Sequence, residues 1–446
     1  MPDKDRWIVV GGGASGMAAA FFLRQRGIDS EIIERDSAIG GRMGALQLGD
    51  RWVDFGGKNL GKRYKLFREF VATLGQHEFE YFGLNSSQVR DGKIVTFDGT
   101  RRWRTLVEMA RHASLRDVVR FARLLWQVWS NEEDGYLGSE FFGSIGRQRD
   151  MSPASSYFSN EFCRRIIRPM SVRMNGAEPD EIYVGNLGSN LRMILDSFDQ
   201  LRSGLAPLLN DFIAAYKVRL NTAVERLLFS NGRVTGVRIR YENGASEDLI
   251  CRGVILATPA WISAGLVASF DFALAQQLRR VSYYPVTLVL AEYDRPIFSA
   301  EVRALVFEED EPLSNAGAYG THDLHLVRYT FSGRSARRYM SDPDKAEELL
   351  DLGEAALNRY IPVKKSERKQ FRARHFALGL CAYARFHSDF LAGLKTRTGE
   401  ISGMYLTGDY IQGASLEACF RSAKNCVEEL MQTDCARHEE FAAVMR

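Results

Sequence analysis

The fold is decided by residues 7–34, which read WIVVGGGASGMAAAFFLRQRGIDSEIIE. The run begins with four apolar residues, the pattern of a short buried strand in a parallel sheet. A glycine-rich turn follows, then a predicted helix over residues 17–26 and a second predicted strand over residues 30–34. Together these parts form one βαβ unit. The glycines that fit the pattern GxGxxG are Gly11, Gly13 and Gly16, with Ala14 and Ser15 inside the turn.

The chemistry of this unit is that of a dinucleotide site. Glycines permit a tight turn and the close approach of a pyrophosphate, whose charge is stabilised by the N–H groups at the helix N-terminus. Glu34 ends the second strand, where its carboxylate can accept hydrogen bonds from a ribose diol. No Gly-Lys-Ser/Thr follows the glycines, which argues against a nucleoside triphosphate site. A purely structural turn is the remaining alternative, and the ordered set of parts disfavours it.

A second glycine pair follows at once in residues 34–44, which read ERDSAIGGRMG. Together with the preceding unit, this segment resembles the phosphate-binding region of the FAD-dependent family that includes flavin amine oxidases, protoporphyrinogen oxidases and phytoene desaturases. The resemblance implies bound FAD, with the backbone of Gly40 and Gly41 close to the pyrophosphate and the guanidinium of Arg42 adding charge there. Arg35, next to the ribose-binding acid, is also an expected cofactor contact.

Residues 51–61, which read RWVDFGGKNLG, resemble the family segment that passes beside the isoalloxazine ring. The resemblance places Gly56 and Gly57 at the cofactor. Lys58 follows this pair and is the one candidate catalytic residue, because a cation near the flavin could bind a substrate carboxylate or favour flavin reduction. The alternative interpretation is an ordinary solvent-exposed loop lysine.

Two later segments resemble the remaining cofactor contacts of the family. Residues 218–239 read as two strands around an Asn-Gly turn, and in the family the residue matching Val224 supports the adenine by a backbone contact. Residues 403–422 resemble the closing FAD motif. The contacts that this motif implies are Gly408 and Asp409 at the ribityl-phosphate region and Leu416 at a helix N-terminus that faces the flavin. Such a helix end stabilises the negative charge of a reduced flavin.

These matches fall in three blocks, separated by two stretches without nucleotide-binding patterns. We therefore expect an α/β fold with a Rossmann-type (GR2-like) FAD-binding domain that is discontinuous in sequence, and an inserted substrate domain of α+β type. The substrate is expected between the two domains. The expected FAD-binding parts are residues 1–84, 205–285 and 375–446, and the expected substrate-domain parts are residues 85–204 (helical) and 286–374 (sheet-containing).

The composition excludes several other classes of protein. The chain has 446 residues and a formal net charge of +3, so it can bury a large core and has no overall attraction to nucleic acid. Its six cysteines form no CxxC pair and its seven histidines no HExxH, so no metal site is expected. No apolar run approaches the roughly 20 residues of a membrane span. The first residues lack the pattern of a secretory signal, and a cytoplasmic location is the resulting expectation.

One stretch, residues 101–130, is rich in arginine and carries three tryptophans. Within it, residues 117–129 have the pattern of a helix with a wide apolar face and an arginine edge. We favour a helix that packs its apolar face into the core. The alternatives are contact with a membrane surface, a lid over the substrate, and a funnel for an anionic substrate. Nucleic-acid binding is not expected, because no recognised binding fold accompanies the stretch.

The reaction is constrained by what the sequence lacks. Many amine oxidases of the family carry a lysine linked through water to flavin N5, and the aligned position here is Leu288. The covalent-flavin cysteine motif is absent as well, so FAD is expected to bind noncovalently. Cys381 is expected to be a buried apolar residue, and His387 a hydrogen-bonded structural histidine.

We expect an FAD-dependent oxidoreductase that removes two hydrogens from a C–C or C–N bond of a small or medium, fairly apolar substrate, with hydride transfer to flavin N5. Desaturation is preferred over amine oxidation because of Leu288. O2 is one expected electron acceptor. Two alternatives keep the same fold: a non-redox FAD enzyme of the sugar mutase type and a non-catalytic escort protein.

Overall fold

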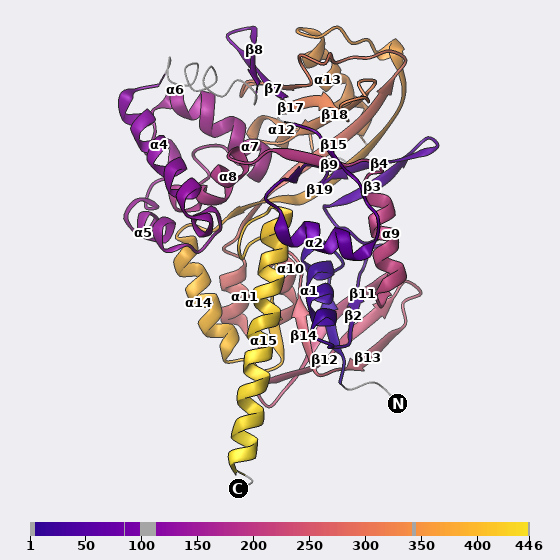
Figure 1. The fold of residues 1–446 in the computed structure, drawn as a ribbon, viewed down its shortest axis with the longest axis vertical. Coiled ribbons are helices and arrows are strands. Elements are labelled where there is room, and N and C mark those ends of the chain that lie inside the picture. Colours follow the sequence, from indigo (N-terminus) through magenta and orange to yellow (C-terminus); the bar gives the residue numbers. More distant parts are fainter. Residues whose placement is uncertain (1–4, 84, 99–112, 341–344, 445–446) are drawn as a thin grey trace.

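The computed structural model describes residues 5–83, 85–98, 113–340 and 345–444. Its centre is a wholly parallel sheet of five strands that come from distant parts of the chain (Figure 1). In spatial order these strands are β10 (Val218–Arg219), β2 (Ser30–Ile33), β1 (Trp7–Val10), β14 (Gly253–Leu256) and β20 (Met404–Leu406). Strands from all three blocks with nucleotide-binding patterns therefore meet in one sheet.

The central strand forms because its apolar side chains enter two different cores. Trp7 and Val9 lie in one core, and Ile8 and Val10 lie in the other. Two helices cover the first side and a three-stranded antiparallel sheet covers the second. The helices are α1 (Ala14–Gln25) and α15 (Leu416–Val444), and the strands are β11 (Thr222–Ser230), β12 (Arg233–Tyr241) and β13 (Ser246–Ile250).

The expected Asn-Gly turn joins β11 to β12. Asn231 and Gly232 have φ values of 50° and 73°, so both central residues of the turn are left-handed. Ser230 pairs with Arg233 across the turn. Asparagine and glycine tolerate this conformation best, which is why the dipeptide predicts the hairpin. The two strands and the turn are confirmed.

A second sheet, of seven mostly antiparallel strands, occupies the upper part of the molecule in Figure 1. Its core packs against two helices, α12 (Arg334–Arg337) and α13 (Ala346–Asn358). In spatial order its strands are β19 (Arg368–Tyr383), β15 (Ser282–Tyr293), β18 (Leu326–Phe331), β17 (Asn315–Ala318), β16 (Ala304–Val306), β7 (Asn85–Arg90) and β8 (Lys93–Asp98).

A group of helices with its own hydrophobic core lies beside this second sheet (Figure 1). These helices are α4 (Leu115–Ser130), α5 (Glu140–Arg149), α6 (Asn160–Phe162), α7 (Arg168–Asn175) and α8 (Leu187–Ile194). The other α-helices of the described residues are α2 (Lys65–Leu74), α9 (Leu205–Ala215), α10 (Ala260–Val267), α11 (Phe272–Leu278) and α14 (His387–Gly399). The remaining strands are β3 (Gly44–Leu48), β4 (Arg51–Gly56), β5 (Leu60–Gly61), β6 (Phe79–Tyr81) and β9 (Phe198–Leu201).

The architecture has the expected Rossmann-type sheet with an inserted α+β part. Some details differ from the expected division of the chain. The stretch 85–204 contributes strands β7 and β8 as well as helices, and β15 and β19 run through the expected boundaries at residues 285 and 374. Domain borders are usually placed at linkers between elements, and a strand that continues through an expected border contains no linker. The domain boundaries stay predictions.

Helix α4 confirms the helix predicted within the arginine-rich stretch. Trp126 and Trp129, however, are 63% and 58% exposed, with ring centroids 4.9 Å apart. The interpretation that this apolar face packs wholly into the core is therefore wrong for the two tryptophans. Residues 101–112, which include four of the arginines and the third tryptophan, lie outside the described residues. The apolar residues that α4 does bury are Phe121, Leu124 and Val128.

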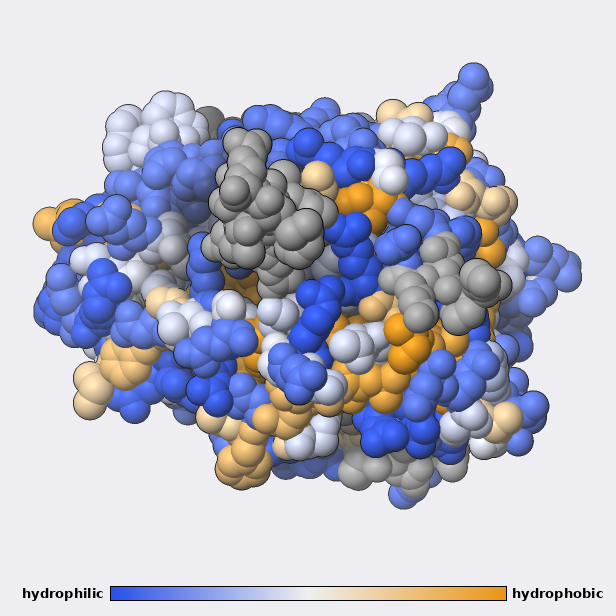
Figure 2. All heavy atoms as spheres, turned by 90° about the horizontal axis from the view of Figure 1, so that it is seen from below, coloured by the Kyte–Doolittle hydropathy of each residue, from blue (hydrophilic) through white to orange (hydrophobic). Residues whose placement is uncertain are grey.

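The end of the molecule at which α15 protrudes is mainly hydrophilic, with apolar residues in separate patches (Figure 2). Across the part of the chain that the structure describes, no helix is both long and apolar enough to cross a membrane. This agrees with the hydropathy pattern of the sequence.

Candidate functional site

One large cavity, of about 590 Å³, is shared by the two sheets. It includes the carboxyl ends of β1 and β2, where open α/β sheets bind ligands, and continues to α7, β15, β18 and β19. Its volume is in the range of ligand and cofactor sites. The expected cofactor residues that line it are Gly11, Gly13, Ala14, Ser15, Glu34, Arg35, Gly40, Gly41, Arg42, Gly56, Gly57, Val224, Gly408, Asp409 and Leu416. Lys58 lines it as well, and Gly16 does not.

Gly16 supports the glycine turn from behind. A Cβ on Gly16 would lie 1.8 Å from the carbonyl oxygen of Gly11, so no larger residue fits unless the turn moves. Gly11 itself has a φ of +100°, a conformation that other residues rarely adopt. Gly13 occupies the N-cap of α1 and offers no side chain to cap it. The first N–H groups of the helix are therefore available to an anionic ligand.

The carboxylate of Glu34 is held against the glycine turn. Its Oε2 accepts the N–H of Gly12 at 2.6 Å, and its Oε1 accepts the N–H of Asp36 at 2.8 Å. These bonds fix the carboxylate just after β2, at the cavity wall. Each carboxylate oxygen has a further lone pair, so Glu34 can accept a ribose hydroxyl while it keeps both bonds.

Replacing Glu34 with alanine is expected to weaken FAD binding about tenfold or more, because a charge-assisted acceptor worth roughly 1.5–3 kcal/mol is lost. The Kd is measured by titrating apoprotein with FAD, and the flavin-to-protein ratio by absorbance after dialysis. Glu34→Gln keeps the size and one acceptor, and should fall between Glu34→Ala and the unchanged protein. Full FAD retention by Glu34→Ala would contradict the ribose contact.

Arg42 joins two motifs that lie 367 positions apart. Its Nη1 forms an ion pair with Oδ2 of Asp409 at 2.5 Å and donates to the carbonyl oxygen of Gly379 at 3.1 Å. Tyr283 donates its hydroxyl to the other carboxylate oxygen of Asp409 at 2.7 Å. Burial alone would lower the pKa of Arg42, but the attraction of Asp409 raises it above its usual value. Both oxygens of Asp409 thus have protein partners, and a charged guanidinium lines the cavity.

Helix α15 begins at Leu416, the residue at which the sequence places a helix N-terminus. Ser415 caps this end, since its hydroxyl accepts the N–H of Ala418 at 3.2 Å. The side chain of Glu417 accepts the N–H groups of Leu66 and Phe67, at 3.0 and 3.1 Å, and so anchors α15 to the first turn of α2. The positive end of a long helix is therefore fixed at the cavity wall.

Lys58 is only 5% exposed, so its interpretation as a solvent-exposed loop lysine is wrong. Its ammonium lies over the rings of Tyr319 and Phe82, 4.0 and 4.6 Å from their centroids. Burial lowers the pKa of Lys58 to about 7; Arg328 lowers it further and Asp54 opposes the shift. The side chain therefore titrates near neutral pH at the cavity wall.

His387 and Cys381 are both buried, as expected. The Nδ1 atom of His387 accepts the N–H of Ala384 at 3.0 Å, and its Nε2 donates to the carbonyl oxygen of Tyr410 at 2.8 Å. Burial lowers the pKa of His387 to about 4, so the imidazole is neutral at pH 7. Cys381 also lines the cavity, and burial raises the pKa of its thiol.

The polar residues of the cavity wall that the sequence patterns do not detect include Arg173 of α7, and Arg328 and Thr330 of β18. In β18, polar residues at alternate positions look like the solvent face of an ordinary strand. The pairing of β18 with β15 shows instead that this face of the strand lines the cavity. Leu288, at the position of the amine oxidase lysine, lies on β15 directly opposite Thr330 and lines the same cavity.

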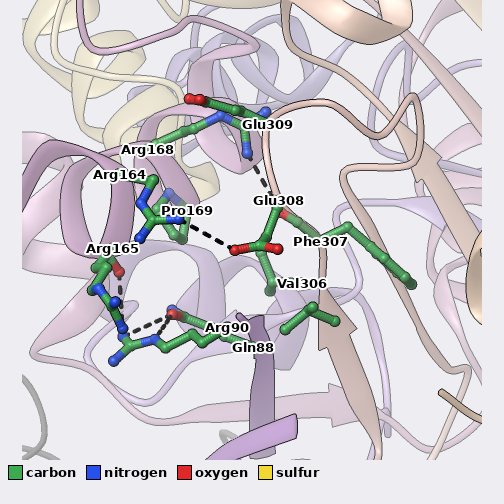
Figure 3. A pocket seen from close by; sticks show the side chains of 11 residues that line it. Gln88, Arg90, Arg164, Arg165, Arg168, Pro169, Val306, Phe307, Glu308 and Glu309 are labelled. Atoms are coloured by element: carbon green, nitrogen blue, oxygen red, sulfur yellow. Dashed lines mark hydrogen bonds and ion pairs between the residues drawn. The ribbon is translucent and has the colours of Figure 1, made fainter. Parts of the chain in front are cut away.

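A second, far smaller hollow lies between the helical group and the seven-stranded sheet (Figure 3). Its volume of about 20 Å³ is close to the space that one water molecule needs. Two of the arginines around it form ion pairs, Arg168 with Glu178 at 2.8 Å and Arg164 with Glu308 at 3.5 Å. We interpret this hollow as an ion-paired joint between two parts of the fold.

Known proteins identify the family of the chain. The model of the family described as flavin containing amine oxidoreductase matches residues 14–431, nearly the whole sequence. The flavin-containing amine oxidase B of Mus musculus is 29% identical over 127 residues, 25% of this chain and 24% of that protein. Protoporphyrinogen oxidase 2 of Arabidopsis thaliana is 24% identical over 207 residues, 45% of this chain and 38% of that protein. The chain thus spans less than half the length of these curated relatives.

Solved structures match the fold over almost its full length. Putrescine oxidase bound to putrescine has a TM-score of 0.72 at 17% identity, and cyclohexylamine oxidase from Brevibacterium oxydans has 0.67 at 15%. Each alignment covers 96% of this chain and 99% of the other. The expected fold class is confirmed. The chain belongs to the flavin-containing amine oxidoreductase family and is an FAD-dependent enzyme, as its sequence motifs predict.

Proposed function

We propose that this enzyme removes two hydrogens from a C–C or C–N bond of a small organic molecule, with FAD as the immediate acceptor. The shared cavity is the observation that carries the proposal. One part of its wall is the glycine turn and the helix ends expected at FAD, and another part comes from α7 and the seven-stranded sheet. A dinucleotide and a substrate can therefore meet in one space.

The residues present fit FAD. Gly40 has a φ of +104°, and a Cβ on it would lie 2.1 Å from the carbonyl oxygen of Met43, so the backbone is bare at this wall of the cavity. The N-termini of α1 and α15 reach the same space. In this assignment Glu34 holds the ribose, α1 and Arg42 hold the pyrophosphate, and α15 faces the flavin.

FAD binding without a covalent bond is part of the proposal. Cys381 and Cys419 line the cavity. Burial raises the pKa of both thiols, so neither is a ready thiolate for attachment to the flavin.

When bound, FAD supplies the acceptor for a hydride from the substrate. The chain itself orients the substrate, excludes water and stabilises charge. Leu288, Val286 and Phe376 give the cavity an apolar wall that disfavours water. The N-terminus of α15 stabilises negative charge that develops beside it. The second hydrogen leaves the substrate as a proton.

Two bond types fall within this proposal. Leu288 in place of the water-linked lysine favours the C–C bond, and hence desaturation. Similarity to an amine oxidase, putrescine oxidase and cyclohexylamine oxidase favours the C–N bond. The products separate the two: an alkene in the first case, and in the second an imine that water converts to a carbonyl compound and an amine.

Anaerobic mixing of the holoenzyme with candidate amines and saturated cyclic compounds tests the proposal. One of the two classes is expected to abolish the visible absorbance of the flavin and to yield one equivalent of the corresponding product. Return of the absorbance on admission of air would identify O2 as an acceptor. If no compound bleaches the flavin while a sugar nucleotide is isomerised, the enzyme is of the mutase type and the proposal fails.

A further inference from the structure

We infer that the end of the cavity formed by β18, α7 and Lys58 binds an anionic group, a carboxylate, on the molecule that the enzyme oxidises. The inference rests on the proposed function and names its class of substrate. It replaces the expectation of a fairly apolar substrate.

Two polar side chains of β18 face this end of the cavity. Arg328 and Thr330 are two positions apart on the strand, so they share one face of the sheet, and both line the cavity. Thr330 is 5% exposed, and its hydroxyl has no hydrogen-bond partner among the described residues. Because a buried hydroxyl without a hydrogen-bond partner is unfavourable, this atom indicates that a bound ligand supplies the missing hydrogen bond.

Lys58 reaches the same end from the loop after β4. Within the described ranges, neither Lys58 nor Arg328 forms an ion pair. Burial lowers the pKa of both groups, and the positive charge of Arg328 lowers that of Lys58 further. The two cations are therefore close together and desolvated, and their mutual repulsion is unfavourable until an anion binds.

Arg173 adds a third cation, from α7. Its side chain has exposed surface, yet desolvation lowers its pKa to about 10, and Arg328 lowers it further. Arg173 lines the cavity, so its exposed surface faces the cavity and not bulk water, which accounts for both the exposure and the desolvation. Cations from a loop, a strand and a helix thus share one end of the cavity.

Among the described residues, the neighbouring acids form no ion pair with Lys58 or Arg328. Asp54 is buried, which raises its pKa, and its Oδ1 already accepts the N–H of Leu205 at 2.9 Å. Asp323 forms an ion pair with Arg51 at 2.8 Å. Arg303 is a further cation that acts on Lys58 in the same direction as Arg328. Positive charge remains in excess around the lysine.

Elsewhere the fold gives a buried arginine its own carboxylate. Arg168 is 4% exposed, at the joint of Figure 3, and it pairs with Glu178 at 2.8 Å. Among the described residues, by contrast, no carboxylate forms an ion pair with Arg328, and Asp54, the acid that raises its pKa, already accepts the N–H of Leu205.

A carboxylate matches these donors. The planar guanidinium of Arg328 can donate two parallel hydrogen bonds, while Thr330 and Lys58 offer an O–H and an ammonium. A phosphate of FAD is the other anion to consider. The pyrophosphate contacts assigned above are the glycine turn after β1 and Arg42 in the segment between β2 and β3, whereas these cations lie on β18, on α7 and in the loop after β4. The experiment separates the two sources.

Holoenzyme is titrated with benzoate, benzamide and benzylamine, which share one ring and differ in charge, and the flavin spectrum reports binding. Benzoate is expected to bind at least about tenfold more tightly than benzamide, with benzylamine the weakest, because only benzoate offsets the buried cations. Equal affinities for benzoate and benzamide would overturn the inference.

Arg328→Met is expected to weaken benzoate binding roughly 10- to 100-fold, and to leave benzamide binding and FAD content unchanged. Thr330→Val keeps the shape of the side chain and should weaken benzoate binding about fivefold, which protects the test if Arg328→Met folds poorly. Arg372→Met is the matched control. Leu290 of β15 pairs with Arg328 on one side and with Arg372 of β19 on the other. Arg372, however, is exposed and does not line the cavity. This variant should bind benzoate as the unchanged enzyme does.

The pH dependence gives an independent readout. Lys58 loses its proton near pH 7, so the affinity for benzoate should fall as the pH rises through about 7. Lys58→Arg should flatten this dependence, because arginine stays charged. A fall of equal size in Lys58→Arg would exclude the lysine from the site.

The outcomes for the inference and for the proposed function are distinct. If Arg328→Met loses FAD and its affinity for benzoate does not fall selectively, Arg328 binds the cofactor and the inference is overturned. Flavin bleaching by an uncharged substrate, with no benzoate binding, would leave the proposed oxidation standing and refute the anion site. Tight benzoate binding with no bleaching by any substrate would support the site and count against the oxidation.

Discussion

Replacing Gly16 with alanine is expected to yield protein without bound FAD. The added methyl group would lie 1.8 Å from the carbonyl oxygen of Gly11, which is a backbone atom and cannot turn aside. The glycine turn must therefore move, and with it the N–H groups at the start of α1 that are assigned to the pyrophosphate. We expect FAD affinity to fall at least about 100-fold, measured by titrating apoprotein with FAD and following the quenching of flavin fluorescence.

Gly265 is the matched control for this substitution. It is also a helical glycine, in α10, but a Cβ there would have no heavy atom within 4 Å. Gly265→Ala should retain FAD and should raise the free energy of unfolding by about 0.5–1 kcal/mol, because alanine favours the helix. If both variants bind FAD equally well, the glycine turn is not the pyrophosphate site.

Replacing Arg42 with alanine is expected to lower the free energy of unfolding by about 3 kcal/mol. The change leaves the carboxylate of Asp409, 4% exposed, without its cationic partner, so that only the hydroxyl of Tyr283 still donates to it. A buried charge without a counterion is strongly unfavourable. The loss is measured on apoproteins by urea unfolding followed by circular dichroism, so that altered FAD binding does not contribute.

An exposed ion pair provides the comparison for Arg42. Arg334 pairs with Asp180 at 2.7 Å, with both side chains about half exposed, so Arg334→Ala should cost less than about 1 kcal/mol. Adding Asp409→Asn to Arg42→Ala should recover part of the lost stability, because a neutral amide needs no counterion. If Arg42→Ala and Arg334→Ala lose equal stability, the Arg42–Asp409 pair does not hold the two motifs together.

The dinucleotide half of the cavity was accessible from the sequence because its parts are local. Gly11 and Glu34 follow short strands, and Leu416 opens a helix, so each lies at a junction that a few neighbouring residues define. The structure brings these junctions to one cavity because parallel strands present their carboxyl ends at the same edge of the sheet.

The other half of the cavity could not be predicted in this way. Arg328 and Thr330 face it only because β18 pairs with β15 in a particular register, and the register of strands distant in sequence is not a local property. The burial of Lys58 depends on Phe82 and Tyr319, which close over it from other segments. Helix α4 shows the same limit, because periodicity cannot decide which of two apolar edges meets the core.

The order of strands in the parallel sheet has a consequence for biosynthesis. Strand β1 is synthesised before its neighbour β14, from which more than 240 positions separate it, and β20 is synthesised after both. Until β14 emerges, one edge of an apolar strand is unpaired, the situation in which nascent chains aggregate or need chaperones. Gly408 and the start of α15 emerge later still, so the proposed cofactor site is complete only after this segment has left the ribosome.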